Sequence, residues 1–469
     1  MKIKLGINKA SMRDVANYCC GELYDFTGNL GCEFEYVCTD SREADENTMF
    51  VATRGERVDG HDYIIKAIES GCRCILCEYV PTNIAGKRVA YVVVENSIDA
   101  FADCAKGYRG EAYMPTVAIT GSVGKTTTKE LCASILKRQF KTYFTEGNFN
   151  SVIGMPMSLM AAEGDCMAAV FEMGMSGFGE IRRMSRAASP TIAMVTNVGS
   201  SHLEYLKTRE NIARAKLEIG EGIIDGGFLL LNGDEPLLRD HYSDRYETVY
   251  VGFSEDCHFN ISNVRVESDG TYFDLSVTKG YFYDLKIPLI GAHFAYNAAF
   301  AAAAAYLLGV DQRDIRAGLA SYVPGNMRMN LYEKNGFTVI ADCYNAAPES
   351  MRGAINTLAA LNVRGRRVAV LGDMKELGKD SDAMHKDIGR YLAVNGVDLL
   401  FTLGESGALI SDAAIEAGMD GNYVFSVSEA DGKDAFAALI KAKINAGDVL
   451  LFKASRSMRL EDVIDKIFG

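Results

Sequence analysis

The sequence predicts an α/β protein with three domains. The chain has 469 residues, and domains commonly hold about 100–200 residues each. Apolar runs of strand length alternate with helical stretches over residues 113–323 and again over 326–469, a pattern typical of helices packed on mostly parallel sheets. Gly110 and Pro115 bracket one linker, and Pro324-Gly325 marks a second boundary. We therefore expect domains at residues 1–112, 113–325 and 326–469.

The first block combines short strands with a helix near residues 64–70. Cys72, Cys74 and Cys77 alternate as strand residues do. Three thiolates and a fourth ligand could hold zinc, but no cluster of Cys or His follows, which favours packed core cysteines. The N-terminus lacks an apolar signal segment, so the 12 cysteines indicate thiols of a cytoplasmic protein.

The second block opens with the strongest local motif. An apolar strand at 117–119 precedes a glycine-containing loop and a helix with one apolar face; the loop comprises Thr120, Gly121, Ser122, Val123, Gly124, Lys125, Thr126 and Thr127. The glycines permit a tight turn whose amides point at an anion. Lys125 supplies a cation for the β- and γ-phosphates, and Thr126 supplies a hydroxyl for Mg²⁺. The motif predicts nucleotide binding, although Ile119 replaces the first glycine of the commonest such pattern.

Two further strands of this block lead into side chains of the kinds that bind metal ions. Glu172 follows the strand at 168–171, and His202 lies shortly after the strand at 192–195. The carboxyl ends of parallel strands line the ligand crevice, so Glu172 is expected to face the phosphates and to suit Mg²⁺. Taken singly, Glu172 could equally be a solvated or helix-capping carboxylate, His202 a structural histidine, and Lys216 a solvated lysine.

The end of the second block and the third block are also strongly patterned. The apolar run at 298–310 is about 13 residues long, shorter than the roughly 20 that span a bilayer, so it predicts a buried helix and no membrane-spanning segment. Strands are expected at 337–343, 366–372, 398–404 and 448–455.

The net charge bears on possible partners. Lys and Arg together number 49 and Asp and Glu together 62, which gives a net charge of −13 and argues against a nucleic-acid partner.

Together these motifs resemble the Mur ligase family over nearly the whole chain. Residues 120–126 are similar to the family's TGTxGKT loop, 172–174 to its EMG motif, His202 to its metal-binding histidine, 215–218 to its AKxE motif, and His293 with Asn297 to its H-x₃-N motif. The resemblance implies a small UDP-sugar-binding α/β domain, a central P-loop ATPase domain with a mostly parallel sheet, and a C-terminal Rossmann-like domain that binds the amine substrate and closes over ATP.

The resemblance also implies residue roles. Lys125 and Arg328 would offset phosphate charge, Arg328 being brought by the third domain, and Thr126, Glu172 and His202 would hold Mg²⁺. Lys216 resembles the lysine that such enzymes carbamylate, which would make it an anionic metal ligand. Asn297 is expected to contact adenine and Asp342 the ribose. The implied cofactors are ATP and Mg²⁺, and the implied catalytic set is Lys125, Lys216, Arg328 and His202.

Other short motifs resemble the branch of the family that adds D-alanyl-D-alanine to UDP-N-acetylmuramoyl-tripeptide in peptidoglycan synthesis. They imply a set of substrate-binding residues: Ser41, Arg42, Asn148, Asn150, Tyr344, Asn345, Lys453 and Ser455. Three positions depart from the usual pattern of this branch. Ala341 stands where an acid is usual, Ala347 where an asparagine is usual, and Ala454 where a glycine is usual. The resemblance leaves open whether the tripeptide ends in meso-diaminopimelate or lysine.

The expected reaction is ATP-dependent amide formation through an acyl phosphate, in a monomer. One alternative is the ligase that adds the third stem-peptide residue, but the Asp-Asn-Pro-Arg motif usual in that enzyme is not found. Folylpolyglutamate synthase shares the ATPase core without this type of UDP-sugar domain. A noncatalytic nucleotide-binding relative is a further alternative, against which the joint presence of Lys125, Glu172, His202, Lys216 and Arg328 argues.

Overall fold

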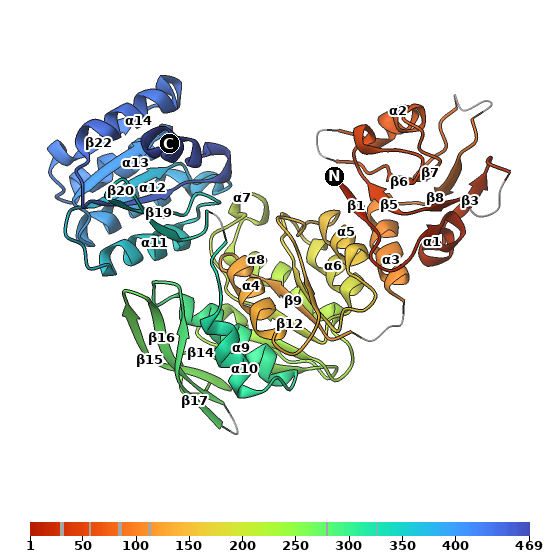
Figure 1. Ribbon diagram of the computed structural model, residues 1–469, viewed down its shortest axis with the longest axis horizontal. Coiled ribbons are helices and arrows are strands. Elements are labelled where there is room, and N and C mark those ends of the chain that lie inside the picture. The colour runs from red at the N-terminus through yellow and green to blue at the C-terminus, as the bar shows by residue number, and fades with distance from the viewer. Residues whose placement is uncertain (29–31, 56–57, 83–86, 111–113, 278–279, 326) are drawn as a thin grey trace.

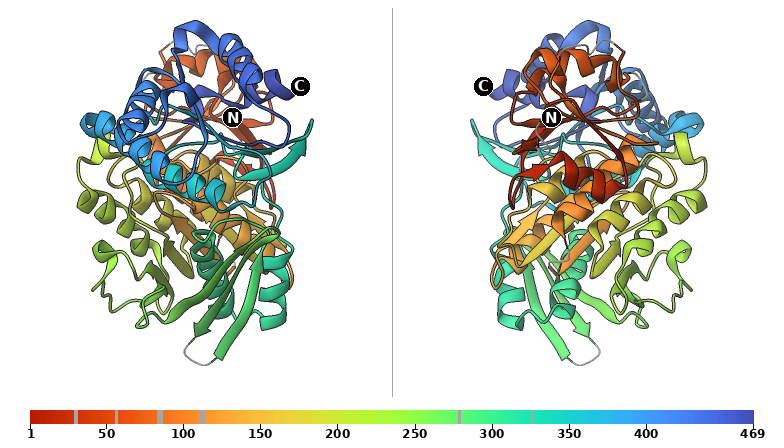
Figure 2. Two further views of the ribbon diagram at one scale, coloured as in Figure 1. Left: turned by 90° about the vertical axis from the view of Figure 1, so that its left-hand side faces the viewer. Right: turned by 90° about the vertical axis from the view of Figure 1, so that its right-hand side faces the viewer.

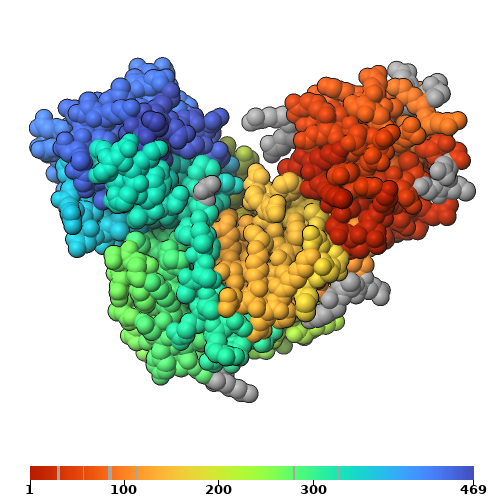
Figure 3. All heavy atoms as spheres, in the orientation of Figure 1, coloured from red at the N-terminus to blue at the C-terminus, as the bar shows by residue number. Residues whose placement is uncertain are grey.

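Three large sheets, each flanked by helices, organise the described residues, and a two-stranded sheet of β2 (Ala10–Ser11) and β4 (Glu33–Phe34) lies in the N-terminal part. The computed structural model describes residues 1–469 except 29–31, 56–57, 83–86, 111–113, 278–279 and 326. In Figure 1 the N-terminal and C-terminal parts lie on opposite sides above the central part, and Figure 3 shows the surface hollowed between them. The predicted α/β class is confirmed. The predicted boundaries after 112 and 325 fall on or beside residues outside those described, and they stay predictions.

The N-terminal sheet has the strand order β1-β5-β6-β7-β8-β3. Its strands are β1 (Lys2–Lys4), β3 (Glu22–Asp25), β5 (Tyr36–Cys38), β6 (Thr48–Val51), β7 (Cys74–Cys77) and β8 (Ala90–Val93). The four inner strands run parallel and both edge strands antiparallel. Helices α1 (Met12–Cys19) and α3 (Ser97–Arg109) pack on one face, and α2 (Ile64–Glu69), the helix predicted near 64–70, packs on the other.

The cysteines around β7 are packed side chains, as predicted. Cys74 belongs to the apolar cluster on the α1/α3 face, whereas Cys72 and Cys77 belong to the cluster on the α2 face. All three thiols are buried. Because the sheet separates them, they do not converge as ligands of one zinc ion.

The central sheet carries the phosphate loop between β9 (Thr116–Thr120) and α4 (Lys125–Leu136), as predicted. Its parallel part also contains β10 (Thr142–Phe144), β11 (Ala168–Glu172), β12 (Ile192–Val195), β13 (Phe228–Asn232) and β14 (Glu247–Gly252), with β9 between β11 and β12. An unpredicted antiparallel extension follows, β15 (Phe259–Glu267), β16 (Gly270–Val277) and β17 (Gly280–Ile287), visible at the lower end of both views in Figure 2.

Helices cover both faces of the central sheet. On one face lie α4, α9 (Phe294–Leu307) and α10 (Gln312–Ala320); on the other lie α5 (Gly154–Ala161), α6 (Glu180–Ala188) and α8 (Arg209–Leu217). The alanines of α9 are almost fully buried, which confirms the helix predicted from the apolar run at 298–310. Among the described residues, no helix combines the length and apolar character needed to cross a membrane. Since α3 shares an apolar cluster with α5 and α6, the N-terminal part is anchored to the central one.

The C-terminal sheet has the order β18-β19-β23-β20-β21-β22. The four predicted strands appear as β19 (Phe337–Ala341), β20 (Arg367–Gly372), β21 (Leu399–Leu403) and β23 (Val449–Lys453); β18 (Asn330–Lys334) and β22 (Val424–Val427) were not predicted. Helices α11 (Pro348–Ala360), α12 (Ser381–Val394) and α13 (Glu405–Glu416) cover one face, and α14 (Gly432–Lys443) and α15 (Glu461–Phe468) cover the other. This two-sided covering is the Rossmann-like arrangement that the family resemblance implies.

Candidate active site

A cleft of about 980 Å³ lies between the central sheet and the C-terminal domain. It is lined by sixteen of the predicted site residues: Ser122, Val123, Gly124, Lys125, Thr126, Thr127, Asn148, Asn150, Glu172, His202, Asn297, Arg328, Asp342, Tyr344, Asn345 and Lys453. Thr120, Gly121, Lys216, Ser41, Arg42 and Ser455 are not part of its lining. Segments separated by more than three hundred positions in the sequence therefore meet at one cavity.

The phosphate loop is held by the neighbouring strand end. The side-chain oxygen of Asn197, which follows β12, accepts hydrogen bonds from the amides of Ser122 (2.9 Å) and Val123 (3.0 Å). Gly124 has a φ of +79°, and a Cβ there would lie 2.3 Å from Asn297 Nδ2. Glycine is thus required both for the backbone conformation and for the close approach of α9. Sequence reasoning assigned no role to Asn197, although it follows a predicted strand.

Lys125 folds back over this loop. Its ammonium group donates to the carbonyl oxygen of Gly121 at 2.8 Å. Burial is the main cause that lowers the Lys125 pKa, and the Glu172 carboxylate opposes that shift. A lysine in this position can exchange carbonyl contacts for phosphate oxygens without leaving the cleft.

Glu172 lies at the carboxyl end of β11 and is only 3% exposed. Its Oε2 accepts a hydrogen bond from Thr126 Oγ1 at 2.7 Å, and its Oε1 accepts one from Asn150 Nδ2 at 2.8 Å. The alternative of a solvated carboxylate is therefore wrong. The parallel pairing of β11 with β9 places the acid beside the phosphate loop, which brings together a hydroxyl and a carboxylate of the type that Mg²⁺ prefers.

Lys216 is not a solvated lysine, because only 1% of it is exposed, in the last turn of α8. Its pKa is lowered well below the ordinary range, first by burial and then by the charge of Lys125. Two residues later, Glu218 accepts hydrogen bonds from the amide of Gly179 at 2.9 and 2.8 Å and so caps α6. The acidic residue of the 215–218 motif thus has a structural function that the sequence did not reveal.

His202 begins the short helix α7 (Leu203–Leu206) with a φ of +66°. Its Nδ1 lies 2.9 Å from Oε2 of Glu376, which belongs to the C-terminal domain. Two elements of different domains therefore meet at this predicted metal ligand.

The predicted nucleotide contacts lie around the loop. Asn297 Nδ2 donates to Thr128 Oγ1 at 2.9 Å and to the carbonyl of Gly124 at 3.2 Å, so α9 is joined to α4. The Arg328 guanidinium stacks on the ring of Tyr344, 3.9 Å from the ring centroid. Such stacking directs a cation while leaving its N–H groups available.

The buried Lys453 and the partly buried Asp342 form an ion pair within the C-terminal part of the cleft. Lys453 Nζ lies 2.5 Å from Asp342 Oδ2 and donates to the carbonyl of Asn345 at 2.9 Å. Asp342 Oδ1 accepts from the amide of Met329 at 3.2 Å. Lys453 therefore fixes the strand end that presents Asp342.

Three predicted substrate residues lie elsewhere. Ser455 Oγ accepts a hydrogen bond from the amide of Lys375 at 2.8 Å, a contact within the C-terminal domain. Ser41 and Arg42 lie in the 3₁₀ turn of the N-terminal domain that Asp40 caps, and the Arg42 guanidinium pairs with Asp40 at 2.5 Å. Arg42 is exposed, so its N–H groups remain accessible to an anionic ligand.

Lys129 is a buried cation that sequence reasoning missed. It lies one turn after Thr126 on α4, and its ammonium group donates to the carbonyl oxygen of Thr145 at 2.7 Å. Thr145 Oγ1 in turn accepts from the amide of Glu172 at 3.1 Å. Lys129 thereby links the phosphate-loop helix to the strand ends around Glu172. Its helical spacing from Lys125 was the only available signal.

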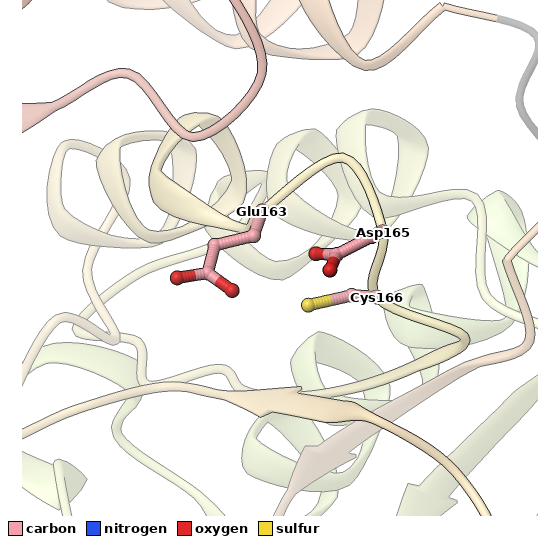
Figure 4. A group of neighbouring side chains, drawn as sticks. All are labelled: Glu163, Asp165 and Cys166. Carbon is pink, nitrogen blue, oxygen red and sulfur yellow. The ribbon is translucent and has the colours of Figure 1, made fainter.

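Among the described residues, another group of side chains that could bind a metal ion lies on the loop before β11 (Figure 4). It consists of Glu163, Asp165 and Cys166. Both carboxylates are exposed and pair with the ammonium group of Lys141, at 2.6 Å for Asp165. Because Lys141 already pairs with both acids, the group is a surface ion-pair cluster.

Models of known protein families match most of the chain. Residues 33–115 match the description "Mur ligase family, catalytic domain", 119–305 match "Mur ligase middle domain", and 327–456 match "Mur ligase, glutamate ligase domain". The UDP-N-acetylmuramoyl-tripeptide--D-alanyl-D-alanine ligase of Bacillus subtilis (strain 168) is 37% identical over 429 residues, 91% of this chain and 92% of the relative.

Solved structures of MurF ligases also resemble this chain. A crystal structure of MurF from Acinetobacter baumannii superposes with a TM-score of 0.88 at 29% identity, covering 99% of this chain and 100% of that one. MurF from Thermotoga maritima, in complex with ADP, gives a TM-score of 0.79 at 30% identity, covering 92% and 96%.

Proposed function

The chain belongs to the Mur ligase family, and on that premise we propose that it joins D-alanyl-D-alanine to UDP-N-acetylmuramoyl-tripeptide. ATP is cleaved to ADP and phosphate in the reaction, and the pentapeptide product serves peptidoglycan synthesis. One observation carries the proposal: Lys125, Thr126 and Glu172 converge in a cleft that the C-terminal domain shares. A ligase of the MurF type spans nearly the same length and fold.

Nucleotide binding is supported by the loop geometry and by the ADP complex of the Thermotoga maritima relative. We propose that the β- and γ-phosphates lie over the amides at the N-terminus of α4, where the helix dipole favours negative charge. Lys125 releases the Gly121 carbonyl and pairs with a phosphate oxygen. Asn297 borders the adenine site, and Asp342 accepts from a ribose hydroxyl. Arg328, aligned by Tyr344, points its guanidinium toward the γ-phosphate.

The donor set fits Mg²⁺. Thr126 and Glu172 offer a hydroxyl and a carboxylate whose oxygens are already 2.7 Å apart, and His202, which lines the same cleft, would add an imidazole. When bound, Mg²⁺ would neutralise phosphate charge and orient the transferred group. Burial lowers the pKa of Lys216 and so favours its neutral amine, the form that reacts with CO₂ to give the proposed carbamate.

The chain needs no nucleophile of its own, because the substrates supply both reacting atoms. The tripeptide carboxylate attacks the γ-phosphorus and forms an acyl phosphate, with ADP as leaving group. The D-alanyl-D-alanine amine then attacks the acyl carbon, and phosphate departs. Lys125 and Arg328 act by offsetting charge during phosphoryl transfer. Approach of the C-terminal domain would exclude water from the acyl phosphate.

Phosphate release tests the proposal. The enzyme is supplied with ATP, Mg²⁺ and UDP-N-acetylmuramoyl-tripeptide ending in either meso-diaminopimelate or lysine, with D-alanyl-D-alanine present or withheld. We expect release that requires the dipeptide, with pentapeptide detected by mass spectrometry. In a parallel reaction with the UDP-muramoyl dipeptide and a single amino acid, release that requires both would identify a ligase for the third residue. Absence of release with every substrate would contradict the proposal.

A further inference from the structure

The segment that carries His202 is held by two carboxylates of the C-terminal domain. Glu349, in the first turn of α11, accepts hydrogen bonds at Oε1 from the amide (2.9 Å) and hydroxyl (2.8 Å) of Ser200. Glu376, on the loop after β20, places Oε2 2.9 Å from His202 Nδ1. The carbonyl of Glu376 also accepts from the amide of Glu204 at 3.4 Å. Figure 1 shows α7 rising from the central domain beside the C-terminal one.

His202 and Glu376 share an unusual backbone conformation. Their φ angles are +66° and +63°, in the left-handed region that side chains other than glycine rarely adopt. Such conformations persist where the surroundings over-determine them, and they gather at functional sites. Here the two strained residues face each other across a domain boundary.

The loop that carries Glu376 is pinned on its other side. The amide of Lys375 donates to Ser455 Oγ at 2.8 Å, and the amide of Met374 donates to His385 Nε2 at 2.9 Å. Ser455 and His385 are both buried. The Glu376 backbone is therefore fixed relative to the C-terminal sheet, although its side chain is 53% exposed.

We propose that Glu376 is a positioning residue for His202. A neutral imidazole has one nitrogen that donates and one that accepts. If the Glu376 carboxylate holds Nδ1–H, the lone pair of Nε2 is directed away from Glu376 and into the cleft, where a divalent cation takes it. A partner on the second nitrogen of a ligating histidine commonly sets its tautomer and ring orientation. This inference rests on the proposed function, in which His202 is a metal ligand.

The contact also couples metal binding to domain arrangement. His202 Nδ1 is buried and finds no aligned hydrogen-bond acceptor among the residues that the structure describes, although Glu376 Oε2 is within ion-pair distance. On this inference, approach of the C-terminal domain toward the nucleotide would align the pair. Glu376 therefore completes the site when Arg328, from the same domain, reaches the phosphates.

The test compares Glu376→Ala and Glu376→Gln with a control, Lys379→Ala, which changes an exposed residue of the same segment. Binding of Mn²⁺ to the full-length enzyme with ADP is measured by the loss of the free-ion EPR signal. We expect Glu376→Ala to weaken Mn²⁺ binding about tenfold. This is the lower end of the loss in metal affinity that is typical when the hydrogen-bond partner of a metal ligand is removed. Glu376→Gln, whose amide oxygen still accepts from Nδ1–H, should recover most of the affinity, and Lys379→Ala should equal wild type.

A second readout needs neither turnover nor metal. Nitrogen-15 NMR of the six histidines in the ADP-bound enzyme, with His202 assigned by His202→Gln, should show the Nδ1–H tautomer in wild type and a mixture in Glu376→Ala. Wild-type Mn²⁺ affinity and tautomer in Glu376→Ala, combined with weakened binding in His202→Ala, would overturn the inference and leave the proposed function intact. Unchanged binding in His202→Ala would overturn both the inference and the role of His202 on which it rests.

Discussion

Thr126 Oγ1 donates a 2.7 Å hydrogen bond to Glu172 Oε2, so the first turn of α4 and the end of β11 meet inside the cleft. The two residues are far apart in the sequence, and parallel pairing of β11 with β9 brings them together. This contact supplies the oxygen pair around which the proposed magnesium site is built.

Replacing Lys125 with Ala should abolish ATP turnover. The ammonium group is proposed to offset charge on the transferred phosphoryl group, and loss of one such group typically lowers kcat about 10²–10³-fold. Phosphate release in the full substrate mixture measures the effect. Lys137→Ala, an exposed lysine at the end of the same helix, is the matched control. Near-normal turnover in Lys125→Ala would refute the assignment.

Glu172→Gln should weaken binding of ADP with Mg²⁺ much more than binding of ADP alone. The amide keeps the size and one oxygen of the carboxylate but loses the negative charge that a divalent cation prefers. Isothermal titration with and without Mg²⁺ should show the metal-dependent gain in affinity reduced about tenfold or more, as for loss of a metal-site group. Glu163→Gln, in the surface cluster of Figure 4, serves as control. An undiminished metal-dependent gain would place Mg²⁺ elsewhere.

Lys216→Ala should inactivate the enzyme, and short carboxylates such as formate or acetate should restore part of the activity. The reason is that a carboxylate diffusing into the vacated space would replace the oxygens of a carbamate. Carbon-13 NMR of wild-type enzyme incubated with labelled bicarbonate should show a carbamate signal that Lys216→Ala lacks and Lys441→Ala, an exposed control, retains. A wild-type spectrum without that signal would contradict carbamylation.

His385 should make the C-terminal domain sensitive to acid. Burial is the main cause that lowers its pKa below the ordinary value of 6.5, and the neutral ring accepts from the amide of Met374. As the pH falls below 6.5, the unfolded chain binds the proton first, so the contribution to stability present above that pH is lost toward the folded-state pKa.

Thermal unfolding between pH 7.5 and 5 measures this effect. His385→Leu should lose about 1–3 kcal/mol at pH 7.5, because the Met374 amide loses its acceptor, and it should then show a smaller further loss on acidification. His258→Gln, an exposed histidine, should follow the wild-type pH dependence. An equal pH dependence in His385→Leu and wild type would exclude His385 as the source.

Local sequence alone predicted those elements whose periodicity is strong. The strand, loop and helix around Lys125 and four C-terminal strands appear as expected, and the buried helix predicted from residues 298–310 appears at 294–307. The antiparallel strands β15–β17 escaped prediction, as did the edge strands β18 and β22. Edge strands carry weaker apolar patterns, because one face or one side is open to solvent.

The sequence by itself determined that this chain has a nucleotide loop and which side chains could serve it, because hydrogen-bonding turns and apolar periods are local properties. Only the tertiary structure decided that Lys216 is buried, that Glu218 caps a helix, and that Glu376 reaches His202 from another domain. Burial and charge proximity depend on contacts between remote segments, and a lysine or glutamate has the same local pattern whether it faces water or a cleft.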